Sequence, residues 1–173
     1  MLKQQFVQKK RKKILKKMKI EIGQNAPLFA LTSNDNKEVR LADFRGQNVV
    51  LYFYPKDDTP GCTIEAQDFA NKSKEFAKHD CIILGVSRDS VASHCKFIAK
   101  YKLNFQLLSD ENSELCEQYG VLKEKSMFGK KSIGIDRSTF LIDKMGKVQR
   151  IWRSVKVNGH IQEILDELSK KQA

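Results

Sequence analysis

The chain has 173 residues, which suffices for one domain with a substantial core, and its 40% hydrophobic content is typical of a soluble globular protein. No apolar run approaches the length that spans a membrane, and the basic N-terminus lacks the apolar segment of a secretory signal. Four cysteines without close pairing do not form the pattern of a disulfide scaffold, so we expect a reducing, cytoplasmic compartment.

The formal net charge of +11 is concentrated at the N-terminus. Residues 1–19 contain nine Lys or Arg and no acid, which leaves 23 basic and 21 acidic side chains for the rest of the chain. We therefore expect a flexible or weakly helical basic extension at 1–19 and a folded domain at 20–173. Such an arm can bind nucleic acid or an anionic surface. A translation start at Met18 would omit most of it, so whether the natural protein contains residues 1–17 stays open.

Apolar runs alternate with amphipathic segments along the rest of the chain. The pattern predicts strands at 28–31, 39–41, 49–54, 81–87, 105–108, 139–142 and 148–155, and helices after Cys62 and at 90–101, 113–119 and 160–170. The turn KMGK at 144–147 indicates a hairpin between the last two strands. This alternation predicts an α/β fold with a mixed central β-sheet flanked by helices.

Cys62 stands where a buried strand gives way to a helix. The run VVLYFY at 49–54 ends at Pro55, and Pro60 and Gly61 break the backbone before apolar positions recur on one helix face. The first-turn amides of a helix and its dipole favour negative charge, and the thiolate is the nucleophilic form of cysteine. We therefore expect Cys62 to be a reactive thiol rather than a packing residue.

The stretch YPKDDTPGCT at 54–63 resembles the peroxidatic-cysteine motif of peroxiredoxins, in the branch called bacterioferritin comigratory protein or peroxiredoxin Q. The similarity continues through GVSRDS at 85–90, LSD at 108–110, KEK at 123–125 and RSTFLID at 137–143. The resemblance implies a thioredoxin-like fold. It also implies a thiol peroxidase that reduces hydrogen peroxide and organic hydroperoxides and is regenerated by thioredoxin or another thiol reductant.

Peroxide reduction requires donors that stabilise negative charge on the sulfur and on the leaving oxygen. The resemblance assigns this role to Arg137, and a guanidinium suits it because it stays charged and presents rigid N–H groups. Thr59 offers a hydroxyl to the sulfur or to a bound oxygen, and Pro55 fixes the chain where it leaves the strand. Glu65, one helical turn after the cysteine, is expected either to orient Arg137 or to be a solvated surface acid.

Attack on a peroxide leaves Cys62 as a sulfenic acid, which a second thiol must reduce. Many members of the branch place a resolving cysteine five residues later in the same helix, and here that position is Gln67. Resolution of that kind is therefore excluded. Cys81, at the start of an apolar strand, and Cys116, in a short amphipathic helix, are expected to pack in the core.

Cys95 is the candidate resolving cysteine. It lies in the polar stretch SHCK within the expected helix at 90–101, where His94 and Lys96 would favour its thiolate. Relatives that resolve from this helix are expected to place the cysteine about one turn later, near Ile98. The alternative is a one-Cys enzyme that is reduced by an external thiol.

We expect no cofactor and no metal, because three histidines and the absence of a Cys-x-x-Cys pair give no zinc-site spacing. The expected partners are a hydroperoxide and a thiol reductant, without specific nucleic acid or a transmembrane segment, in a monomer or weak dimer. The alternative function is a redox-inactive thioredoxin-fold binding protein whose basic arm contacts nucleic acid or membrane. A disulfide oxidoreductase would need a Cys-x-x-Cys pair at the helix start.

Overall fold

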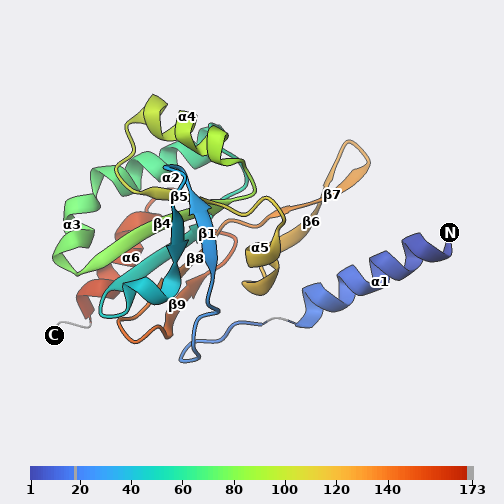
Figure 1. Cartoon of the computed structure of the whole chain (residues 1–173), viewed down its shortest axis with the longest axis horizontal. Coiled ribbons are helices and arrows are strands. Elements are labelled where there is room, and N and C mark those ends of the chain that lie inside the picture. The colour runs from blue at the N-terminus through green and yellow to red at the C-terminus, as the bar shows by residue number, and fades with distance from the viewer. Residues whose placement is uncertain (18, 171–173) are drawn as a thin grey trace.

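The computed structural model describes residues 1–17 and 19–170 (Figure 1). In chain order its elements are α1 (Leu2–Lys17), β1 (Ala30–Ser33), β2 (Glu38–Arg40), the 3-10 turn η1 (Leu41–Phe44), β3 (Asn48–Phe53), α2 (Pro60–Asn71), α3 (Ser73–Lys78), β4 (Cys81–Ser87), α4 (Val91–Tyr101), β5 (Gln106–Ser109), α5 (Glu114–Gln118), β6 (Leu122–Met127), β7 (Lys130–Ile135), β8 (Ser138–Ile142), β9 (Val148–Trp152) and α6 (His160–Lys170). The strands and helices expected from the sequence are confirmed, with ends that shift by a few residues.

Seven of the described strands form one mixed sheet in the order β2-β1-β5-β4-β3-β8-β9. Strands β3, β4 and β5 run parallel, whereas β8 runs antiparallel to β3. The C-terminal ends of β3 and β4 therefore meet the N-terminal end of β8 at one edge of the sheet. The loop that leads to Cys62 leaves the sheet at this edge, as ligand-binding loops of α/β sheets commonly do.

Strand β3 supplies the core on both faces of the sheet. Val49, Leu51 and Phe53 face a cluster that includes side chains of η1 and α5. Val50 and Tyr52 face a second cluster that includes side chains of α2, α3, α4 and α6 (Figure 1). Burial on both faces explains why the sequence of β3 is continuously apolar rather than alternating. The α/β sandwich predicted from the sequence is thus the observed architecture.

A two-stranded hairpin, β6 and β7, is the main element that the sequence pattern did not predict. Its strands are joined by Phe128 and Gly129, whose φ angles of 52° and 75° form a two-residue turn of the kind that matches strand twist. Most of its side chains are exposed, so the sequence contains no alternation of core and solvent positions. The Phe-Gly pair between polar runs was the one local signal for it.

The basic extension forms helix α1, which stands clear of the sheet in Figure 1. The sequence had favoured a flexible or weakly helical arm, and the structure gives its described part a regular helix. Within residues 1–17 and 19–170, no helix is long and apolar enough to cross a membrane.

Candidate active site

Cys62 lies in the first turn of α2. Thr59 is the N-cap in extended backbone, Pro60 is the first helical residue, and the helical ladder begins where the Thr63 N–H donates to the Thr59 carbonyl at 2.9 Å. The amides of Gly61 and Cys62 therefore precede the ladder and form part of the positive end of the helix dipole. Cys62 is only 2% exposed, so its sulfur is shielded from bulk water at a helix end that favours an anion.

Arg137 brings a positive charge to Cys62 from the neighbouring strand. It directly precedes β8, whose first residue, Ser138, pairs with Phe53 at the end of β3. Its Nη2 donates to Cys62 Sγ at 3.3 Å, and its side chain is 15% exposed. Burial opposes the charge of Arg137, but the neighbouring Glu65 and Cys62 outweigh burial and raise its pKa. The guanidinium therefore stays cationic beside the sulfur.

Glu65 holds the other edge of the same guanidinium. Its side chain is completely buried, and Oε1 accepts from Arg137 Nη1 at 2.7 Å. Burial raises the pKa of Glu65 to about 7, and Arg137 acts in the opposite direction. The guanidinium of Arg137 is planar and rigid, so the bond from Nη1 to Glu65 also directs Nη2 at the Cys62 sulfur. The contact with Arg137 is confirmed, and the interpretation of Glu65 as a solvated surface acid is wrong.

Gly61 makes this close packing possible. A Cβ atom added at Gly61 would lie 3.2 Å from Arg137 Nη2, which is tighter than ordinary van der Waals contact. A side chain at this position would push the guanidinium by a few tenths of an ångström. The glycine beside the cysteine therefore favours the close approach of Arg137.

Thr59 and Pro55 shape the loop that precedes Cys62. The Thr59 hydroxyl donates to the Lys56 carbonyl at 2.8 Å and not to the Cys62 sulfur. Pro55 is half-buried where the chain leaves β3, and Asp58 adopts a left-handed backbone with a φ angle of 55°. Both residues belong to the loop before the cysteine, and the sequence could not show that the Thr59 hydroxyl donates to Lys56.

A row of buried polar side chains lies across the sheet on the α2 and α6 face. Tyr52, Thr139 and Trp152 are cross-strand neighbours on β3, β8 and β9. Thr139 Oγ1 lies 2.7 Å from His160 Nε2, and the His160 ring meets the Trp152 ring edge-on. Burial, together with the positive charge of Arg137, lowers the pKa of His160 to about 4, so its imidazole is neutral. Sequence reasoning missed this row, whose one signal was the polar residues within apolar strands.

All four cysteines of the chain are free thiols in the structure. Cys81 and Cys116 are buried in the two core clusters, as expected. Burial raises the pKa of Cys81 to about 12 and raises that of Cys116 further still. Both thiols are therefore protonated and unreactive near neutral pH. Cys95 is exposed on α4, as its polar flanks predicted.

His94 does not share the exposed face of α4 with Cys95, although the sequence had suggested that the two side chains lie together. His94 is fully buried and points away from solvent, with Nδ1 2.7 Å from Asp57 Oδ2 and Nε2 2.9 Å from the Leu108 carbonyl. Neighbours on a helix differ by about 100° in direction, which allows one residue to face the core and the next to face solvent. That His94 and Cys95 are neighbours in the sequence does not show which way each side chain points.

One group of potential metal ligands occurs among the residues that the structure describes: Asp57, Asp89 and His94, with ligand atoms within 4.8 Å of one another. These atoms already bond to protein groups. Besides the contact of Asp57 with His94, Asp89 Oδ2 accepts from the Asp57 amide at 2.9 Å and from the Ser87 hydroxyl at 2.6 Å. Hydrogen bonding within the protein thus accounts for the cluster.

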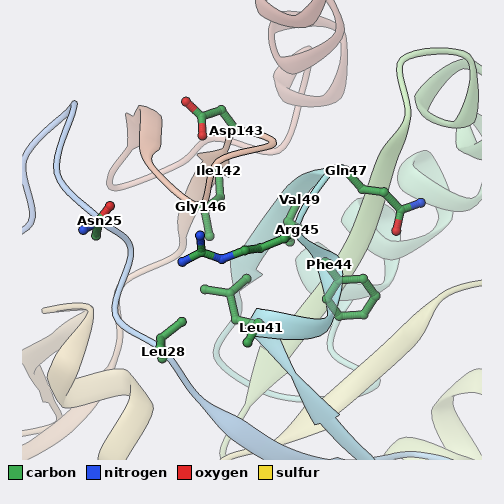
Figure 2. A pocket seen from close by; sticks show the side chains of 11 residues that line it. Asn25, Leu28, Leu41, Phe44, Arg45, Gln47, Val49, Ile142, Asp143 and Gly146 are labelled. Carbon is green, nitrogen blue, oxygen red and sulfur yellow. The ribbon is translucent and has the colours of Figure 1, made fainter.

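A pocket of about 120 Å³ lies at the opposite end of β3 from Cys62 (Figure 2). Its lining comes from residues 25–28, 41–49 and 142–146, and Figure 2 shows the Arg45 side chain extending beside Leu41. None of the residues around Cys62 lines it. Cys62 therefore lies at the other end of β3 and outside this pocket.

Comparison with known proteins gives consistent matches over the folded domain. The AhpC/TSA family model matches residues 22–151. Peroxiredoxin Bcp of Bacillus subtilis is 50% identical over 151 residues, which cover 87% of this chain and 96% of that protein. Peroxiredoxin Bcp of Escherichia coli is 42% identical, with coverage of 87% and 97%. The family match begins after the basic extension.

Solved structures agree with these relatives. The bacterioferritin comigratory protein of Xanthomonas campestris, studied for alkyl peroxide reduction, has a TM-score of 0.80 at 45% identity and covers 84% of this chain and 92% of its own. A cysteine-to-serine variant of Xylella fastidiosa PrxQ has a TM-score of 0.85 at 40% identity, with coverage of 90% and 99%. Both similarities extend over nearly the whole folded domain.

Proposed function

The chain belongs to the AhpC/TSA family and is a thiol peroxidase of the peroxiredoxin Bcp type, and from this premise we propose that Cys62 is its peroxidatic residue. The single observation that supports this assignment is the contact of Cys62 Sγ with Arg137 Nη2 at 3.3 Å, in the first turn of α2. Among the four thiols, Cys62 is the one whose sulfur accepts a hydrogen bond from a cationic side chain, and it also lies in the first turn of a helix. A thiolate is the nucleophile, and both features favour it.

The proposed reaction is a displacement at oxygen. The Cys62 thiolate attacks one oxygen of a hydroperoxide, a sulfur–oxygen bond forms, the O–O bond breaks, and the alcohol or water leaves after its oxygen takes up a proton. Arg137 and the amides of Gly61 and Cys62 stabilise the charge on the sulfur and on the leaving oxygen. Thr59 is proposed to release the Lys56 carbonyl and donate to the bound peroxide. Pro55 fixes the loop that aligns these groups.

The second half-reaction regenerates the thiol. The exposed Cys95 thiol attacks the Cys62 sulfenic acid, a disulfide forms, and water leaves. A dithiol of the thioredoxin type then reduces the disulfide by exchange. The protein groups that act on the peroxide and on the sulfenic acid all belong to one chain, so we propose that a monomer is sufficient for these two steps. Four free cysteines favour a reducing compartment such as the cytoplasm.

After one equivalent of hydrogen peroxide, the wild-type protein is expected to contain a disulfide between Cys62 and Cys95. Cys62 is buried and Cys95 is exposed, and a disulfide needs Cα atoms within about 7 Å. Formation therefore requires local opening of the first turn of α2, with a loss of helix signal in circular dichroism. Non-reducing peptide mapping by mass spectrometry measures the linked peptide directly.

The control for this experiment is Cys95→Ser, which should stop at sulfenic and sulfinic acid on Cys62. If oxidised wild type also stops there, with no linked peptide, an external thiol reduces Cys62 and the one-Cys route applies. If Cys62 is not modified at all, its assignment as the peroxidatic residue is wrong.

The basic extension is expected to be dispensable for catalysis. We propose that residues 1–19 and 20–173 are separate parts, because α1 stands clear of the sheet and the family match starts at residue 22. A chain that begins at Met18 should keep its peroxidase rate and lose salt-sensitive adhesion to nucleic acid or anionic lipid. Steady-state kinetics and binding at two salt concentrations measure both properties. Loss of activity on truncation would instead mean that the arm packs on the domain.

A further inference from the structure

A buried hydrogen-bonded network outside the thiol site joins the Cys62 loop to helix α4. Asp57, in the loop between β3 and α2, is 7% exposed, and His94, in the first turn of α4, is fully buried. Asp57 Oδ2 lies 2.7 Å from His94 Nδ1 and accepts from Ser93 Oγ at 2.8 Å. Asp57 Oδ1 accepts from the Tyr54 hydroxyl at 2.6 Å. The Asp57 carboxylate therefore contacts three side chains, one before it in the chain and two on α4.

Both nitrogens of the His94 ring have hydrogen-bond partners. Nε2 faces the Leu108 carbonyl, which can only accept. Nδ1 faces the Asp57 carboxylate, which already accepts from the hydroxyls of Tyr54 and Ser93. Burial raises the pKa of Tyr54 well above its ordinary value, so Tyr54 keeps its proton and donates it. A ring that donates at Nε2 and shares one proton with Asp57 Oδ2 at Nδ1 satisfies every group in this arrangement.

We propose that His94 is a positioning residue of the peroxidase, which acts through Asp57 to hold the loop that presents Cys62. The proposal rests on the proposed role of Cys62. The same loop has a second link to α4, because Asp58 accepts from Lys100 at 2.8 Å and from Tyr101. The pair of Asp58 with Lys100 is solvent-exposed and contributes little. The buried pair is therefore the stronger connection between the loop and the helix.

This connection also controls how the loop opens. Cys62 must leave the first turn of α2 to reach Cys95, and Cys95 is the residue after His94 on α4. While the loop is held, Cys62 stays beside Arg137 in the geometry that reacts with peroxide. Loss of the His94 donor would leave the buried Asp57 carboxylate one hydrogen bond short, which is strongly unfavourable. The loop would then open more often and Cys62 would be in reactive geometry less often.

Two substitutions of His94 separate its hydrogen bond to Asp57 in the loop from its hydrogen bond to the Leu108 carbonyl in β5. His94→Asn places an amide near the position of Nδ1 and keeps a donor toward Asp57. His94→Gln places it near the position of Nε2 and keeps a donor toward Leu108. Both variants replace the ring with a carboxamide, so both lose the core packing of the imidazole. The comparison therefore isolates the bond between residue 94 and Asp57.

The experiment measures hydrogen exchange in residues 55–63 and the second-order rate constant for oxidation of Cys62 by hydrogen peroxide. We expect His94→Gln to exchange the amides of Asp57 and Thr63 about tenfold faster than wild type. We expect its Cys62 oxidation to be about tenfold slower, since small misplacements at a reacting centre are costly. His94→Asn should show clearly smaller changes in both quantities.

Two further variants keep the test decisive. Val39→Ala removes buried core methyls on β2 and should lower overall stability without faster exchange confined to 55–63. Ser93→Ala removes one donor to Asp57 from a half-buried position, and it should accelerate exchange in the same segment by a smaller factor. If both His94 variants fold and behave like Val39→Ala, His94 only fills the core and the proposal fails. If the His94 variants do not fold, Ser93→Ala decides, and unchanged exchange in residues 55–63 of that variant would also overturn the proposal. Failure of the peroxidase assignment itself would be seen separately, as absence of Cys62 oxidation in wild type.

Discussion

Replacing Cys62 with serine is expected to reduce peroxide consumption to the uncatalysed background. The substitution exchanges only the sulfur for oxygen, and a serine hydroxyl is a weak nucleophile because, unlike a thiol, it is not deprotonated near neutral pH. The side chain that contacts residue 62, Arg137, is a hydrogen-bond donor and does not accept the hydroxyl proton. The fold should be unchanged, because serine is nearly isosteric with cysteine and its hydroxyl can accept from Arg137 Nη2 as the sulfur does. Coupled peroxidase kinetics with a thiol reductant measure the loss.

The matched controls are Cys81→Ala and Cys116→Ala. Both thiols are buried, and burial raises the pKa of each far above neutrality, so neither supplies a thiolate to the reaction. Alanine avoids placing an unsatisfied hydroxyl in the core. Both variants should retain most of the wild-type rate per folded molecule. Substantial turnover in Cys62→Ser, or its loss in a control that remains folded, would place the reactive thiol elsewhere.

The sequence predicted those parts of the fold and site that depend on short-range patterns. The apolar run of β3, the breaks at Pro55 and Pro60 and the helix after them together place Cys62 in a first turn, and the structure has this arrangement. Arg137 was identified through the family resemblance, and the pairing of β8 with β3 explains why it arrives beside the cysteine. These features follow from local propensity and from sheet topology.

Side-chain direction was the part that the sequence could not supply. Thr59 has a hydroxyl three residues before the cysteine, yet its proton goes to Lys56. His94 precedes Cys95 in the chain, yet it faces Asp57 across the buried side of α4. The exposed hairpin of β6 and β7 was missed because its residues do not alternate between core and solvent. The outcome is decided by a local turn for Thr59, by a long-range contact for His94 and by the absence of core contacts for the hairpin, and the residue pattern encodes none of these.

Arg137→Lys is expected to lower the rate constant for Cys62 oxidation by about a hundredfold, as loss of one charge-assisted donor at a reacting centre typically does. In the wild type, Nη1 bonds to Glu65 while Nη2 bonds to Cys62, and the planar fork fixes both contacts at once. A lysine ammonium keeps the charge but is a single point on a flexible chain. The ammonium can bind either the buried Glu65 carboxylate or the Cys62 sulfur, and the buried carboxylate attracts it more strongly.

The control for this prediction is Arg40→Lys, which makes the same change in an exposed pair with Glu38 and should leave the rate unchanged. The measurement is the pre-steady-state oxidation of Cys62, which is separate from its later reduction. A slower first step with an unchanged yield of disulfide per oxidised Cys62 is the pattern expected if Arg137 acts on the thiolate and the leaving oxygen. A near-normal rate constant in Arg137→Lys would show that positive charge alone is sufficient. The direction that Glu65 imposes on the guanidinium would then have no part in catalysis.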